Sequence, residues 1–226
     1  ERRLTYREFD RLSRQFATML RAYEVEPGDP VAALLRNGIE YCALYHAIAR
    51  LGAVLCPVNW RLASAEIDYI LKNSSAEILL YNSVFDETVK SLSDQGELRH
   101  RIAIDDEPDG KFAALLNDCE PIEGPCPANP DDPLLIIHTS GTTGSPKGVV
   151  LTQGQMVWSS ITMAATLDYH RGDVSLISAP MFHVGGLSFA TLFVHLGATA
   201  VLTPEWDPDR VLDMIGRESI NHFFVV

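Results

Sequence analysis

Short apolar runs alternate with segments of helical spacing along most of this 226-residue chain. In residues 5–23, for example, apolar side chains recur at helical intervals, and Thr5 with Glu8 matches a capping box. Strands separated by helices form parallel sheets through right-handed crossovers, so the alternation predicts an α/β fold with parallel-rich sheets and flanking helices. The expected helices are 5–23, 38–51, 64–72, 84–93, 152–167, 186–196 and 208–217, and the expected strands are 30–35, 53–57, 76–81, 101–104, 133–138, 149–151, 173–177, 198–202 and 221–226.

Residues 105–133 break this alternation, because acidic residues and then prolines replace the apolar periodicity. Such composition is typical of a solvated surface connection. We therefore expect two lobes, the first over about residues 1–104 and the second over 134–226, joined by this connection.

A hydroxyl- and glycine-rich segment lies between two apolar, strand-like runs. It reads Thr139-Ser140-Gly141-Thr142-Thr143-Gly144-Ser145-Pro146-Lys147-Gly148. Glycine lets backbone N–H groups approach an anion, hydroxyls donate to phosphate oxygens, and Lys147 adds a mobile positive charge. A flexible linker has a similar composition, but here apolar strands fix both ends of the segment. The segment is therefore predicted to bind a polyphosphate.

The segment is not a Walker A loop, which needs Gly-Lys-Ser/Thr directly ahead of a helix. Pro146 precedes the lysine, Gly148 follows it, and a strand-like run comes next. Proline lacks an N–H group and biases the preceding residue away from helical geometry. A P-loop NTPase is therefore disfavoured.

Bulk properties exclude some partners. The formal net charge of −12 argues against nucleic acid, since binding to a polyanion depends on basic patches. Cys42 and Cys56 lie in apolar runs without C-x-x-C spacing and are expected to be core thiols in a reducing compartment. No long uncharged apolar stretch predicts an integral membrane segment, so we expect a cytoplasmic protein.

A second group of residues, 179–187, follows the strand expected at 173–177. Ligands of open α/β sheets bind beyond the carboxyl ends of the strands, which is where His183 falls. Taken alone, His183 is more often structural than catalytic. Its place after the phosphate segment favours a functional role.

Together these motifs closely resemble the adenylate-forming superfamily, which includes acyl- and aryl-CoA synthetases and the adenylation domains of peptide synthetases. In that superfamily a Pro-x-Phe-His segment, here Pro180-Met181-Phe182-His183, follows the signature loop by several tens of residues. Earlier fragments follow the order seen in fatty acyl-CoA synthetases: Leu4-Thr5-Tyr6, Gly28-Asp29, Arg36-Asn37, Leu51-Gly52-Ala53-Val54, Pro57-Val58-Asn59-Trp60-Arg61-Leu62 and Glu66-Ile67. The resemblance thus extends from near residue 4 to residue 226.

The resemblance implies a ligase that activates a carboxylic acid with ATP and Mg²⁺ and passes the acyl group to a thiol, either coenzyme A or a carrier protein. By resemblance, the catalytic residues are Lys147 and His183. The residues that would hold ATP are Thr139, Ser140, Gly141, Thr142, Thr143, Gly144 and Lys147, with Thr139 near the metal. His183, Val184, Gly185 and Gly186 would contact the acid.

The identity of the acid depends on Gly185. Aryl-acid ligases tend to carry a bulky residue at this place, and a glycine leaves room for an extended chain. We therefore expect a medium- or long-chain fatty acid. An aryl- or o-succinylbenzoate-CoA ligase and a nonenzymatic nucleotide-binding module remain as alternatives.

Several motifs of the superfamily are not found in the sequence. An aromatic-Gly-x-Thr-Glu segment, a later Thr-Gly-Asp motif and the small C-terminal domain with its lysine are missing. We therefore expect an incomplete N-terminal domain that binds ATP weakly by itself and needs the C-terminal part of the same enzyme. The sequence leaves a homodimer open.

Overall fold

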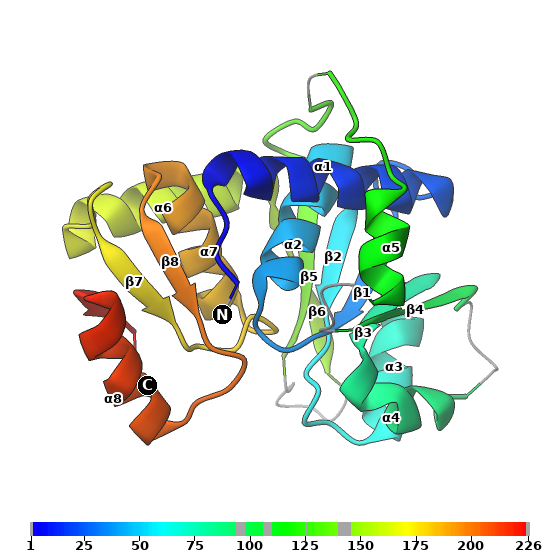
Figure 1. Cartoon of the computed structure of the whole chain (residues 1–226). Helices are drawn as coiled ribbons and strands as arrows, with labels where there is room; N and C mark the ends of the chain where they lie inside the picture. The colour runs from blue at the N-terminus through cyan, green and yellow to red at the C-terminus, as the bar shows by residue number, and fades with distance from the viewer. Residues whose placement is uncertain (1, 94–97, 106–109, 125, 140–145, 225–226) are drawn as a thin grey trace.

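A computed structural model describes residues 2–93, 98–105, 110–124, 126–139 and 146–224 (Figure 1). The helices are α1 (Tyr6–Ala22), α2 (Ile39–Leu51), α3 (Ser64–Ser74), α4 (Asp86–Lys90), α5 (Lys111–Asn117), α6 (Gln153–Leu167), α7 (Val184–Leu196) and α8 (Pro208–Glu218), with a 3-10 turn η1 (Ser83–Phe85). The strands are β1 (Pro30–Leu34), β2 (Val54–Pro57), β3 (Ile78–Asn82), β4 (His100–Ile104), β5 (Pro133–Thr139), β6 (Lys147–Thr152), β7 (Val174–Ile177), β8 (Thr199–Leu202) and β9 (His222–Phe223). The alternation expected from the sequence is confirmed.

The strands form two sheets. A six-stranded sheet has the order β4-β3-β1-β2-β5-β6, and a three-stranded sheet has the order β8-β7-β9. Every neighbouring pair is parallel except β5 and β6, which form an antiparallel hairpin. In Figure 1 the smaller sheet lies with α6, α7 and α8 on one side of the molecule, and α1 to α5 surround the larger sheet. The predicted parallel-rich α/β class is therefore confirmed.

Local sequence signals place most element ends. Thr5 caps α1 as predicted: its hydroxyl accepts from the Glu8 N–H at 3.3 Å, and its own N–H donates to the Glu8 carboxylate at 2.7 Å. Gly52 ends α2 in the left-handed conformation, with φ of 71°. Thr152, at the start of the helix expected over 152–167, caps α6 with a second capping box.

Two features differ from the sequence-based expectation. Helix α5 lies inside residues 105–133, where we expected only a solvated connection, because Phe112 and Leu116 form a short apolar face. Phe112 packs against Phe16 of α1, with 5.5 Å between ring centroids. In addition, β5 and β6 belong to the larger sheet, although residues 134–226 were expected to form the second lobe. The boundary between the two sheets therefore falls between β6 and β7.

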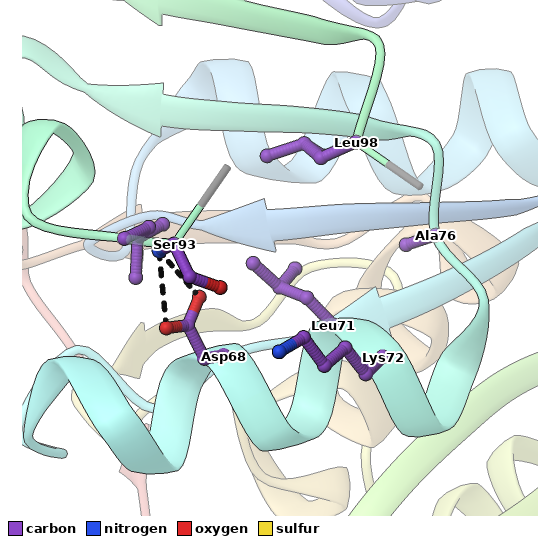
Figure 2. A pocket seen from close by; sticks show the side chains of 7 residues that line it. Asp68, Leu71, Lys72, Ala76, Ser93 and Leu98 are labelled. Atoms are coloured by element: carbon purple, nitrogen blue, oxygen red, sulfur yellow. Dashed lines mark hydrogen bonds between the residues drawn. The ribbon is translucent and has the colours of Figure 1, made fainter. Parts of the chain in front are cut away.

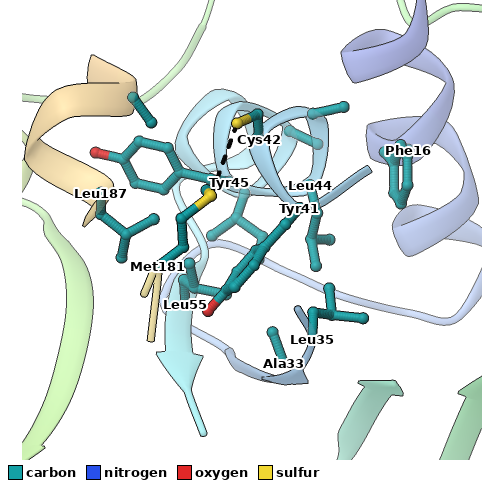
Figure 3. Packing of buried hydrophobic residues seen from close by; sticks show 14 of the residues in the cluster. Phe16, Ala33, Leu35, Tyr41, Cys42, Leu44, Tyr45, Leu55, Met181 and Leu187 are labelled. Atoms are coloured by element: carbon teal, nitrogen blue, oxygen red, sulfur yellow. Dashed lines mark hydrogen bonds between the residues drawn. The ribbon is translucent and has the colours of Figure 1, made fainter. Parts of the chain in front are cut away.

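Helix α2 lies between the larger sheet and α7. Tyr41 and Tyr45 are almost fully buried among Leu55, Met181 and Leu187 (Figure 3). The Tyr45 hydroxyl lies 2.8 Å from the Thr191 hydroxyl on α7. One continuous core therefore joins the two sheets.

Cys42 and Cys56 are buried free thiols, as predicted. Burial raises the pKa of Cys42 to about 12 and that of Cys56 to about 11, so both stay protonated at neutral pH. Among the described helices, none combines the length and apolar character that crossing a membrane requires.

His46 makes folding stability sensitive to acid. Its Nε2 is buried without a hydrogen-bond partner among the described residues, and the ring packs against Phe9 and Tyr45. Burial, and to a lesser extent Arg50, lowers the pKa of His46 from 6.5 to about 4. Arg50 also pairs with Asp10 at 2.9 Å, so its positive charge stays beside the ring.

The unfolded chain therefore binds this proton before the folded chain does, and stability falls as pH drops from 6.5 towards 4. We expect the His46 contribution to the free energy of unfolding to decrease by about 2 kcal/mol between pH 8 and pH 5. Urea unfolding at several pH values checks this. In His46→Leu, the slope over this window should become shallower; an unchanged slope would contradict the assignment.

Candidate functional site

The carboxyl ends of β1, β2 and β5 lie at the same edge of the larger sheet, because these strands are parallel neighbours. Arg36 and Asn37 follow β1, Trp60 and Arg61 follow β2, and Thr139 ends β5. In parallel α/β sheets this edge is where ligands bind. The structure therefore gathers residues that are far apart in the sequence.

Thr139 and Lys147 lie opposite each other in the β5–β6 hairpin. They are paired in register, and both are exposed. Lys147 has no ion-pair partner within the part of the chain that the structure describes. The other predicted ATP-binding residues, Ser140, Gly141, Thr142, Thr143 and Gly144, lie outside the described residues.

His183 occupies the N-cap position of α7 without a side-chain capping bond, and it is only partly covered by its neighbours. The ring of the buried Phe182 lies 4.7 Å from the His183 ring. Partial burial, and then the nearby Arg61 guanidinium, lower the pKa of His183. A neutral ring at neutral pH can offer one N–H to a phosphate or carboxylate oxygen.

Asn37 fixes the segment that leads to His183. Its Nδ2 donates to the Ala179 carbonyl at 2.9 Å, and its Oδ1 accepts from the Met181 N–H at 2.8 Å. Asn37 is buried and follows β1, so these bonds tie the segment after β7 to the larger sheet. The sequence motifs include Asn37 but indicate no role for it.

Two arginines surround an aromatic group beside His183. The Arg61 guanidinium lies 4.8 Å from the Trp60 ring centre and 5.7 Å from that of Phe182. Arg36 lies 5.5 Å from the Trp60 ring, and its Nη1 approaches Glu205 at 3.9 Å. These cation–π contacts hold both guanidinium groups beside Trp60, and the Arg61 charge lies close enough to act on His183.

The sequence motifs include Arg36 and Arg61 but give neither residue a role. Arg36 and Arg61 precede the phosphate segment by many tens of residues, and no local spacing links them to His183. Only the order of the strands brings them together. Trp60, which was quoted only within a family fragment, is half-buried between Phe85 and Phe182.

The two glycines after His183 differ in their surroundings. A Cβ atom on Gly185 would meet nothing within 4 Å, so there is open space beside it. A Cβ atom on Gly186 would lie 2.6 Å from the Pro180 carbonyl oxygen and 2.8 Å from that of Ala179. Gly186 is therefore required by packing against the backbone, while Val184 is exposed.

No group of three or more metal-ligating His, Cys, Asp or Glu side chains occurs among the residues that the structure describes. Proteins usually hold Mg²⁺ with one or two carboxylates together with substrate phosphates. The Thr139 hydroxyl alone does not provide such a site. Lys147, His183 and Arg61 are groups at this edge that can meet an anion.

Comparison with known proteins identifies the family. The family model described as AMP-binding enzyme matches residues 1–226. The chain is 33% identical over 222 residues to the long-chain-fatty-acid–CoA ligase FadD13 of Mycobacterium tuberculosis, covering 96% of this chain and 43% of that protein. It is 35% identical over 224 residues to a feruloyl-CoA synthase of an Amycolatopsis species, covering 99% of this chain and 43% of that protein.

Solved structures agree with this result. The N-terminal domain of FACL13 from M. tuberculosis superimposes with a TM-score of 0.90 at 31% identity, covering 97% of this chain and 55% of that chain. The chain belongs to the AMP-binding enzyme family, and the two relatives named above are CoA ligases. This confirms the resemblance to adenylate-forming enzymes, and the chain spans less than half the length of the two ligases above.

Proposed function

We propose that this chain is the incomplete N-terminal domain of an AMP-forming ligase that activates a carboxylic acid with MgATP and then forms an acyl thioester with coenzyme A. The main support for the proposal is that the candidate residues lie at one edge of the larger sheet. Thr139 at the end of β5 and Lys147 at the start of β6 share this edge with Asn37, which holds the segment leading to His183. One edge thus presents positive charge and a hydrogen-bond donor to a nucleotide and an acid.

In the first step, a carboxylate oxygen attacks the α-phosphorus of ATP. A new P–O bond forms, the bond from the α-phosphorus to the bridging oxygen breaks, and pyrophosphate leaves with the electron pair. Because an anion approaches a polyanion, the step depends on charge neutralisation and alignment. Lys147 offsets charge on the phosphates, and neutral His183 donates to a phosphate or carboxylate oxygen.

In the second step, a thiolate attacks the acyl carbon of the adenylate, and AMP leaves. Coenzyme A is the proposed thiol, as the names of the relatives suggest. Mg²⁺ is proposed to arrive with ATP rather than in a protein-held cage. The C-terminal part of the same polypeptide is proposed to complete the site.

The proposed acid is a medium- or long-chain fatty acid. The open space beside Gly185 supports this, since an extended chain needs room that a side chain would fill. FadD13, named as a long-chain ligase, is a relative at 33% identity. An aryl acid is the second candidate, because the feruloyl-CoA synthase is 35% identical.

Acid-dependent exchange of labelled pyrophosphate into ATP by the complete polypeptide tests the proposal. We expect exchange with fatty acids from hexanoate to stearate, and little with ferulate or benzoate. Preference for ferulate would favour the aryl-acid ligase. Absence of exchange with every acid, in protein that still binds ATP, would favour a nonenzymatic nucleotide-binding module.

A further inference from the structure

Helix α3 contacts the chain on both sides of residues 140–145. The Tyr69 hydroxyl donates to the Pro146 carbonyl at 3.0 Å, and Asn73 Oδ1 lies 2.9 Å from His138 Nε2. Tyr69 and Asn73 are one helical turn apart, so they lie on the same face of α3. A single helix face therefore meets the end of β5 and the residue before β6.

Buried side chains and hydrogen bonds hold α3 in place. Ile67, Ile70 and Leu71 are buried in a cluster with residues of β1, β2 and β3. Asp68, which lines a small pocket together with Leu71, adds a further bond: its two carboxylate oxygens each accept from the Ser93 N–H at 3.1 Å (Figure 2). The cavity beside Asp68 has room for little more than a water molecule. Movement of α3 would disrupt both the buried cluster and the bonds to Ser93.

The contact with Pro146 bears directly on Lys147. The Pro146 carbonyl and the Lys147 N–H belong to one planar peptide unit. A bond to this carbonyl therefore fixes the orientation of the backbone from which the Lys147 side chain leaves. Because proline has no N–H group, the carbonyl is the only polar backbone group that residue 146 offers.

The contact with His138 bears on Thr139, which is the next residue. His138 pairs in register with Gly148, and a Cβ atom on Gly148 would lie 3.4 Å from His138 Nε2 and 3.6 Å from Asn73 Oδ1. The same missing Cβ would lie only 2.9 Å from the Ile136 Cγ2. The glycine thus leaves the space in which the histidine and the asparagine meet.

We propose that Tyr69 and Asn73 are positioning residues for ATP: they fix Thr139 and Lys147 at the separation that the phosphates require. This inference rests on the proposed function of the edge. Neither residue needs to touch the nucleotide. Their loss should weaken the use of ATP without changing the use of the acid.

The first test is Tyr69→Phe in the complete polypeptide, which removes the hydroxyl and keeps the ring. We expect the KM for ATP to rise about fivefold, from the loss of one hydrogen bond, while the KM for the acid stays within twofold. Asn73→Ala should have a similar effect. Equal rises in both KM values would overturn the proposal.

Tyr6→Phe is the matched control. The Tyr6 hydroxyl lies 2.7 Å from the Phe193 carbonyl oxygen and 2.6 Å from that of Ala198, so its one hydrogen can be donated to either; both are far along the chain from the hairpin. Both tyrosine variants should lower the melting temperature, but only Tyr69→Phe should change the KM for ATP. If Tyr6→Phe changes it equally, Tyr69 has only a structural role.

A double-mutant cycle asks whether Tyr69 acts through Lys147. Tyr69→Phe should change ATP binding several-fold in the wild-type background and by less than twofold in the Lys147→Ala background. Equal effects in the two backgrounds would overturn the proposal.

The same cycle separates this inference from the proposed function. If Lys147→Ala leaves pyrophosphate exchange unchanged, the proposed role of the sheet edge fails. If Lys147→Ala abolishes exchange while Tyr69→Phe and Asn73→Ala match Tyr6→Phe, only the positioning role fails.

Discussion

Replacement of Gly186 by alanine is expected to lower the free energy of unfolding by about 3 kcal/mol, at the upper end of the cost of overpacking. The new Cβ atom would lie 2.6 Å from the Pro180 carbonyl oxygen and 2.8 Å from Met181 Cα, which are backbone atoms. The backbone cannot retreat freely, because Asn37 holds Ala179 and Met181 from the other side. Either α7 shifts or the Asn37 bonds break.

Gly185→Ala is the matched control for this prediction. Its Cβ atom would meet nothing within 4 Å, and both glycines lie in the first turn of α7. Since alanine favours helix over glycine, we expect Gly185→Ala to be neutral or to stabilise by about 0.5 kcal/mol. Urea unfolding of the two variants measures the difference. Equal stabilities would contradict the crowding at Gly186.

Replacement of Lys147 by alanine is expected to lower kcat/KM for ATP about 100-fold in pyrophosphate exchange, the usual loss when one transition-state donor is removed. Lys147 is exposed at the start of β6, opposite Thr139, and no acidic group among the described residues neutralises it. Its charge is therefore available to a phosphate.

Two further variants sharpen this prediction. Lys111→Ala removes an exposed lysine from α5 and should leave kcat/KM within twofold. Lys147→Arg keeps the charge but replaces a compact ammonium by a planar fork, so we expect partial activity. Activity of Lys147→Ala close to that of Lys111→Ala would remove Lys147 from the proposed mechanism.

The sequence predicted the parts of the fold that depend on local signals. Thr5 with Glu8, Gly52 and Thr152 each define a helix end through bonds or dihedral angles within one turn. Helix α5 was not predicted because prolines and acidic residues around it dominate the local composition. Its stability depends on Phe112 packing against α1, a contact that no short window contains.

The candidate site was predicted in part. The family signature indicated Lys147 and His183, and the structure places Lys147 at the described end of the hairpin and His183 at the start of α7. Arg61, Asn37 and Tyr69 could not be predicted, because their roles come from partners that strand order brings close. The ATP-binding roles expected for residues 140–144 remain predictions, because these residues lie outside the described part of the chain.

The two hydrogen bonds made by the Asn37 side chain have a structural consequence. One amide group, acting as donor and acceptor at once, links the stretch before α7 to the sheet that carries the lysine hairpin. An aspartate at this position would lose the donor, and a leucine would lose both bonds. The segment before His183 and the sheet that carries Lys147 are therefore linked through one side chain, and loss of Asn37 would uncouple them.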